Sequence, residues 1–92
     1  MLKVEILGSA EDDLEKIVRH YKSIDSKLAR QFIDEFAIAL KFIQYFPEAA
    51  PTIRKNARRV IIKTFPYIAI YRIKKNQIQI AAVFHQKRKQ EN

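Results

Sequence analysis

The stretch that decides the fold is residues 60–84, VIIKTFPYIAIYRIKKNQIQIAAVF. It contains a short β-branched run at 60–62, a second apolar run at 67–73 and a cleanly alternating segment over 77–84. Lys75-Asn76 is typical of a tight turn between the last two. Apolar and polar residues that alternate with period two indicate strands with one buried face. The stretch therefore predicts an antiparallel meander of three strands.

Before Pro51 the apolar period is helical instead. Two stripes recur at helical spacing: Ala10, Leu14, Ile17, Val18 and Tyr21, then Leu28, Phe32, Phe36, Leu40 and Ile43. Ser9 with Asp12 three residues later has the spacing of a capping box, and Asp25 restarts the helical pattern. Pro47 ends the second helix. The short link between the helices predicts an antiparallel hairpin.

The first residues complete the order of elements. Residues 2–7 alternate between apolar and polar and predict a half-buried strand. The order β-α-α-β-β-β predicts an α+β fold, one domain over residues 1–92. In it, the helical hairpin packs on one face of a small, mainly antiparallel sheet.

Composition narrows the classes of function. The 92-residue chain has no Cys, which excludes disulfides, thiolate metal sites and cysteine catalysis. Its two His residues, His20 and His85, are too few for a zinc site without carboxylates. No apolar run approaches the roughly 20 residues of a membrane span, and the N-terminus lacks a signal-peptide pattern. We expect a soluble, cytoplasmic protein without a cofactor or metal.

Charge is divided sharply between the two parts of the chain. Residues 1–51 hold seven Lys/Arg against nine Asp/Glu, a net charge of −2. Residues 52–92 hold eleven Lys/Arg against Glu91 alone, a net charge of +10. Such one-sided charge predicts a cationic surface that meets an acidic partner or phosphate. The alternative is a solvated face that only keeps the protein soluble.

Five segments, in this order and spacing, are similar to one known family. They are AEDDLEKIVRHY (10–21), ARQFIDEF (29–36), FPEAAP (46–51), RRVIIKTFPYIAIYRI (58–73) and AAVFHQKR (81–88). Through them the chain resembles the RelE/ParE superfamily of toxins from type II toxin–antitoxin systems, and the ParE-like (plasmid stabilisation) branch most closely. The resemblance implies a small α+β toxin that an antitoxin neutralises by wrapping it.

The resemblance also implies two different activities. ParE-type toxins poison DNA gyrase, so that replication stalls with broken DNA, whereas RelE-type toxins cut messenger RNA in the ribosomal A site through the 2′-hydroxyl. Our first hypothesis is a gyrase-binding toxin that is not an enzyme. The second is a ribosome-dependent RNA endonuclease, and the third is a non-toxic relative that still binds an antitoxin.

Cleavage of RNA needs a base, an acid and cations around the phosphate. The candidates for these roles are Arg59, Lys63, Arg72 and His85. Arg59 and Arg72 are expected on neighbouring strands, close to each other. The cleaving relatives use a basic side chain or His together with a Tyr near the C-terminus, and here no Tyr follows Tyr71. This departure from the pattern favours binding over cleavage.

Three further residue types have structural alternatives. His85 is a candidate for catalysis, or an imidazole that closes the sheet edge by hydrogen bonding. Glu48 is a carboxylate base in the manner of some relatives, or a solvated acid of the loop. Tyr67 and Tyr71 share one face of their strand, with Arg72 on the other, and are expected to pack against the sheet rather than stack on bases.

Binding is expected to depend on the cations of the second part of the chain. The residues expected to contact the target or the antitoxin are Arg58, Arg59, Lys63, Arg72, His85, Lys87 and Arg88. The antitoxin is expected to be acidic and amphipathic, with apolar anchors against the helical hairpin and carboxylates against the basic sheet. The sequence leaves open which apolar residues receive those anchors.

Overall fold

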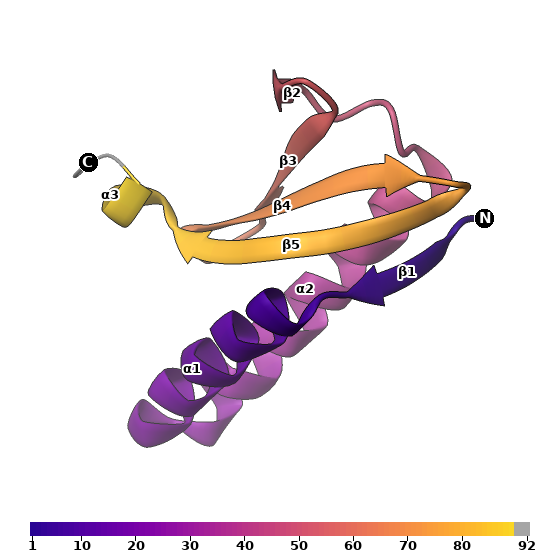
Figure 1. Cartoon of the computed structure of the whole chain (residues 1–92). Coiled ribbons are helices and arrows are strands. Elements are labelled where there is room, and N and C mark those ends of the chain that lie inside the picture. The colour runs from indigo at the N-terminus through magenta and orange to yellow at the C-terminus, as the bar shows by residue number, and fades with distance from the viewer. Residues whose placement is uncertain (90–92) are drawn as a thin grey trace.

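In a computed structural model of the chain, residues 1–89 are described, the side chains of Arg88 and Lys89 excepted. The predicted β-α-α-β-β-β order is confirmed, and a short strand, β2, and a single helical turn, α3, add to it (Figure 1). The elements are β1 (Lys3–Ile6), α1 (Gly8–Ile24), α2 (Ser26–Tyr45), β2 (Thr52–Arg54), β3 (Ala57–Ile62), β4 (Tyr67–Lys74), β5 (Gln77–His85) and α3 (Gln86–Lys89).

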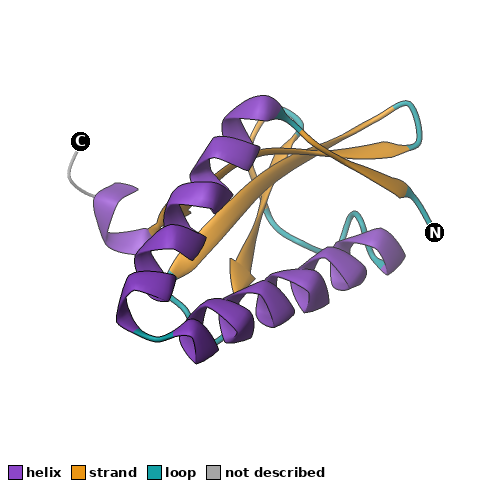
Figure 2. Cartoon of the chain, turned by 90° about the horizontal axis from the view of Figure 1, so that it is seen from below, coloured by secondary structure: helices purple, strands orange, loops and turns teal. Residues whose placement is uncertain are grey.

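The five strands form one sheet in the order β1-β5-β4-β3-β2. The predicted antiparallel meander is confirmed, since β3 pairs with β4 and β4 with β5 in opposite directions. β1 lies at one edge of the sheet and is parallel to β5. Both long helices cover the same face of the sheet (Figures 1 and 2). We call this the covered face, and the opposite one the open face.

Three turns contain left-handed backbone, and the first is at Lys55, between β2 and β3, with a φ of 46°. Lys75 and Asn76, the predicted tight turn, have φ angles of 53° and 60°. Positive φ at both central residues is the signature of a type I′ turn, which suits the twist of the hairpin it joins. Thr64, between β3 and β4, has a φ of 76°. A β-branched residue rarely adopts this conformation, so this connection is strained.

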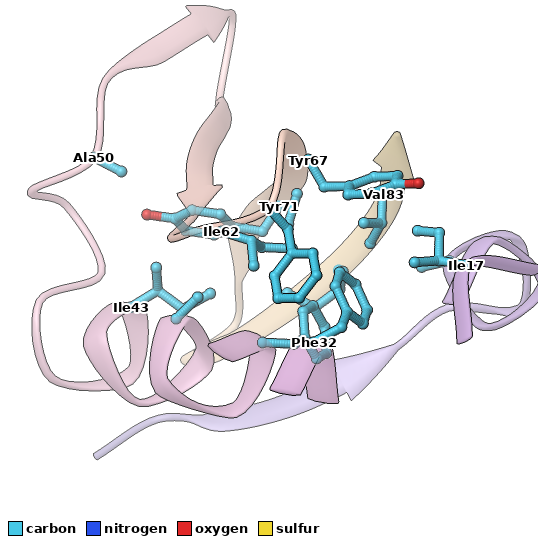
Figure 3. Packing of buried hydrophobic residues seen from close by; sticks show 14 of the residues in the cluster. Ile17, Phe32, Ile43, Ala50, Ile62, Tyr67, Tyr71 and Val83 are labelled. Atoms are coloured by element: carbon cyan, nitrogen blue, oxygen red, sulfur yellow. The ribbon is translucent and has the colours of Figure 1, made fainter. Parts of the chain in front are cut away.

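The core lies between the helices and the covered face (Figure 3). Phe32 and Phe36 of α2 are buried, as are Tyr67 and Tyr71 of β4, which confirms their predicted packing roles. Phe32 meets Tyr67 edge to face, with ring centroids 5.6 Å apart. The two tyrosine hydroxyls point to opposite ends of the core, that of Tyr71 toward the loop that carries Ala50.

Of the two predicted helix starts, the structure confirms the second and not the first. The capping-box prediction for Ser9 is wrong, because α1 begins at Gly8 and Leu7 is its N-cap residue, without a side-chain cap. Ser9 instead donates its hydroxyl to the carbonyl of Ala81, at 2.7 Å. The restart at Asp25 is confirmed, since its carboxylate accepts the amide of Lys27 at 2.9 Å and caps α2.

Candidate functional site

The strand register decides which cations share a surface. Residues directly opposite in an antiparallel pair point to the same face. Arg72 is opposite Ala57, and Arg59 lies two positions from Ala57, so Arg59 and Arg72 are diagonal neighbours on the open face. Both side chains are exposed. Their predicted placement on neighbouring strands is therefore confirmed, although the two arginines are diagonal neighbours and not directly opposite each other.

Apolar residues lie beside these cations on the open face. Ile61 follows Arg59 on the same side of β3, and its side chain is 54% exposed. Ile70 of β4 is directly opposite Arg59, so it is a diagonal neighbour of Ile61 on the same face. Glu5 is the only acid among the strand residues, all of which are described. Its carboxylate accepts a hydrogen bond from Gln79 at 3.0 Å. The open face is thus a cationic surface with an apolar strip.

Arg58 lies on the other face. It is opposite the buried Tyr71, and its Nη1 donates to the carbonyls of Glu48 and Ala50 at 2.9 and 2.7 Å. The Tyr71 hydroxyl donates to the carbonyl of Pro47 at 2.8 Å. Burial raises the pKa of Tyr71, an effect that the positive charge of Arg58 partly opposes. Arg58 and Tyr71 together fasten the loop that follows α2, where the Glu48 side chain stands exposed.

His85 also lies on the covered face, because it is opposite Tyr67. The two rings meet edge to face at 5.3 Å, and His85 Nδ1 accepts the amide of Lys87 at 3.1 Å. This hydrogen bond at the end of β5 agrees with the structural alternative for His85. The structure consequently separates His85 from the open-face pair Arg59 and Arg72. Lys87 is exposed in α3, and the Arg88 side chain lies outside the described part of the chain.

Lys63 occupies a third place, in an apolar groove between α2 and β3. One hollow of about 370 Å³ is lined by Ile38, Phe42, Val60, Ile61 and Lys63, among others. A second hollow of about 250 Å³ shares Phe42, Val60 and Ile61 and continues to Pro51 and Arg59. We call the two together the α2–β3 groove. Arg59 belongs both to this groove and to the open face.

The groove contains surface that the sequence reasoning missed. Ile38 is 61% exposed and Phe42 is 43% exposed, despite their apolar side chains. With Tyr45 they recur at i, i+4 and i+7, a second stripe on α2 beside the core stripe of Phe32 and Phe36. An α2 with two apolar stripes was the signal in the sequence that pointed to this surface.

One border of the groove is an open strand edge. β2 pairs with β3 only through Thr52 opposite Arg58 and Arg54 opposite Ala57. The amide of Arg59 turns away from β4, to the carbonyl of Pro51 at 3.2 Å. Alternate residues of a strand turn their polar groups to the same side, so the N–H and C=O of Ile61 also face outward. Among the described strands, none pairs with β3 on that side at residues 60–62.

Two other kinds of site are absent from residues 1–89. No group of three or more His, Asp or Glu side chains there is arranged to hold a metal ion. Within the same residues, every helix is too short or too polar to cross a bilayer.

The sequence and the fold are similar to those of known proteins. Residues 4–90 match the family model described as the ParE toxin of the type II toxin–antitoxin system parDE. The fold is similar to a solved structure of the chromosomal ParDE toxin–antitoxin system from P. aeruginosa, with a TM-score of 0.78 and 22% sequence identity. That likeness covers 92% of this chain and 96% of the other. Among curated proteins, none matches.

Proposed function

Because this chain belongs to the ParE toxin family, we propose that it acts by binding DNA gyrase, which blocks replication, and that an acidic antitoxin neutralises it. The observation that carries the choice of binding over cleavage is the separation of the candidate nuclease residues. His85, the candidate acid or base, lies on the covered face, whereas Arg59 and Arg72 lie on the open face and Lys63 in the α2–β3 groove that Arg59 also borders.

Phosphodiester cleavage needs an acid and a base within hydrogen-bond reach of the same phosphate that the cations hold. Side chains on opposite faces of a sheet do not converge on one phosphate. A surface of arginines around apolar side chains has instead the composition of protein-binding surfaces, in which Arg is enriched and large apolar groups supply contact area. The open face, with Arg59, Ile61, Ile70 and Arg72, is therefore our candidate for the gyrase contact.

The α2–β3 groove is our candidate for the antitoxin contact. It offers apolar hollows at Ile38 and Phe42, an open edge at Ile61, and two cations, Arg59 and Lys63, against one acid, Glu35. An acidic, amphipathic segment fits all three, because an added strand pairs with the edge while alternate side chains enter the hollows. Since Arg59 borders both surfaces, an antitoxin seated in the groove would compete with gyrase for the same guanidinium group.

The test is DNA supercoiling by purified gyrase with increasing amounts of this protein. We expect inhibition by the wild type and a clear loss of inhibition in an Arg59→Ala, Arg72→Ala double variant. Lys22→Ala, an exposed lysine at the end of α1, is the control that keeps inhibition. Supercoiling that continues unchanged at saturating protein would overturn the gyrase assignment.

The two other hypotheses predict different results in cells. Induction of a ribosome-dependent endonuclease would cut translated messages at A-site codons, and Arg59→Ala or Arg72→Ala would abolish the cuts. A non-toxic relative would be harmless when expressed without an antitoxin. Controlled induction that scores the DNA-damage response, message cleavage and growth together distinguishes all three.

A further inference from the structure

A polar cleft of about 510 Å³ lies on the covered side of the sheet, away from the surfaces described above. Its walls are α1 on one side and the neighbouring ends of β4 and β5 on the other. The polar residues that line it are Asp13, Lys16, His20, Tyr21, Tyr67 and His85. We call it the histidine cleft, because its two walls carry the only histidines of the chain.

The wall from α1 presents polar side chains in a row, one acid, one lysine and one histidine. Asp13, Lys16 and His20 follow at i, i+3 and i+7, so they lie on one face of the helix. Asp13 already accepts the amide of Val83 through Oδ2, at 2.9 Å, so its carboxylate is engaged by the protein's own backbone. Lys16 and His20 are exposed. They remain the side chains of this wall that can donate to a ligand.

The opposite wall holds an imidazole of fixed tautomer. Because His85 Nδ1 accepts the amide of Lys87, the ring proton of the neutral imidazole resides on Nε2. The edge-to-face contact with Tyr67 restrains the ring. His85 is thereby prepared to donate a hydrogen bond whether or not it carries a charge.

A chain of rings joins the two walls. The ring centroids of His20 and Tyr21 lie 5.2 Å apart, those of Tyr21 and Tyr67 6.3 Å, and those of Tyr67 and His85 5.3 Å. The pKa of Tyr21 is raised, chiefly by burial. The neighbouring Tyr67 raises it further, through its charge and through a side-chain hydrogen bond. The phenol therefore stays neutral at physiological pH and adds no negative charge to the cleft.

We propose that the histidine cleft binds a phosphate monoester, held by Lys16, His20 and the Nε2–H of His85. Three donors on two facing walls suit the several oxygens of one phosphate, and charge-assisted hydrogen bonds of this kind are the strong ones. The cleft is larger than a phosphate and lies in the range of small-molecule pockets. It therefore has room for the group that carries the phosphate, such as a nucleoside.

The test is a titration of the full-length protein, in chloride buffer at constant ionic strength, followed by NMR chemical shifts and by calorimetry. The two probes are inorganic phosphate and adenosine 5′-monophosphate. We expect shifts centred on the His20 and His85 rings, and binding weakened about tenfold or more by Lys16→Gln, as for the loss of one charge-assisted hydrogen bond. If the nucleotide binds more tightly than phosphate, the cleft also recognises the nucleoside that carries the phosphate. If the two probes bind equally, the cleft recognises the phosphate group alone.

Two controls separate the cleft from the other cations. Lys22→Gln, on the same helix but outside the cleft, should bind as the wild type does. Arg59→Ala with Arg72→Ala removes open-face cations, so unchanged binding there confirms that the cleft is the site. Lys16 is exposed, so its substitution leaves the fold intact, and His85→Gln provides a second variant for the opposite wall. The proposal is overturned if neither probe binds, or if the cleft variants bind as the wild type does while the open-face variant does not.

Discussion

The carboxylate of Asp13 accepts the backbone amide of Val83 at 2.9 Å and so ties the first helix to the last strand across 70 residues of sequence. One helical turn earlier, Ser9 donates to the carbonyl of Ala81 at 2.7 Å. Both bonds reach β5 beyond Ile80, the last residue that pairs with β1, and Ala81 also lies at the register shift between Ile70 and Tyr71. A strand edge without a neighbour leaves backbone groups without ladder partners, and here the side chains of α1 supply them.

Asp13→Ala should lower the free energy of unfolding by about 1–3 kcal/mol, because the amide of Val83 would lose its acceptor in a partly buried place. The measurement is urea denaturation followed by circular dichroism. Asp12→Ala is the matched control, an exposed acid one position earlier, and should cost less. Equal losses in the two variants would show that the helix dipole, and not the contact with β5, explains the effect.

Tyr71→Phe should reduce the loss of stability at alkaline pH. The pKa of Tyr71 is raised from its usual value of 10.0, chiefly by burial. The unfolded chain therefore ionises first, so stability is fully present below pH 10.0 and declines as the pH rises through the higher folded value. The pKa of Tyr21 is also raised. The Tyr71→Phe variant should therefore still lose some stability at alkaline pH, because Tyr21 remains.

Near neutral pH, Tyr71→Phe should also cost about 1 kcal/mol, since the carbonyl of Pro47 loses its donor. Denaturation curves at neutral and alkaline pH measure both effects. Tyr45→Phe is the control, because Tyr45 is 61% exposed. An alkaline decline as steep in Tyr71→Phe as in the wild type would contradict the argument.

Thr64→Asn should stabilise the protein by about 1 kcal/mol, because Asn tolerates the left-handed conformation that strains a β-branched residue. The φ of Thr64 is 76°. Thermal unfolding by calorimetry is the measurement. Thr52→Asn tests a threonine that does not have a positive φ, and it should bring no gain. A lower melting temperature for Thr64→Asn would mean that the threonine side chain contributes more than its strain costs.

Ile38→Ser should weaken antitoxin binding while leaving the fold intact, since it removes an apolar contact from the α2–β3 groove. The loss should be about tenfold or more in Kd if Ile38 is one of the anchors, as for truncation of a buried interface side chain. Ile24→Ser is a close control, because Ile24 is 60% exposed and Ile38 is 61% exposed. Similar affinities of both variants for the cognate antitoxin would exclude the groove.

Association of the antitoxin should slow markedly as ionic strength rises, because salt screens the attraction between its acids and the cations of the sheet. Arg59→Ala should lower the association rate at low salt and flatten its dependence on salt. Stopped-flow measurements over a range of NaCl concentrations give both quantities. Lys22→Ala is the control for the loss of one positive charge. Rates that are indifferent to salt would contradict the prediction of electrostatic steering.

Local patterns in the sequence were sufficient for the architecture. The strand over 77–84, the turn at Lys75-Asn76 and the stripe that includes Phe32 each depend on neighbours along the chain, and the structure confirms all three elements. The single buried face predicted for 77–84 is wrong beyond Ile80, because the register shift at Ala81 turns Ala82 and Phe84 to the open face and Val83 to the core. The capping role of Ser9 failed because its hydroxyl found a partner on β5, 72 residues away. No local rule anticipates such a contact.

The sequence by itself determined the elements, their order and the excess of positive charge in the second part of the chain, because period and composition are properties of neighbouring residues. Only the tertiary structure decided where that charge is displayed. Arg58 and Arg59 are adjacent in sequence, yet one fastens a loop and the other faces outward, since successive strand residues point to opposite faces. The separation of His85 from Arg72 and the opening of the groove beside Ile61 likewise depend on strand register and on which edge remains unpaired.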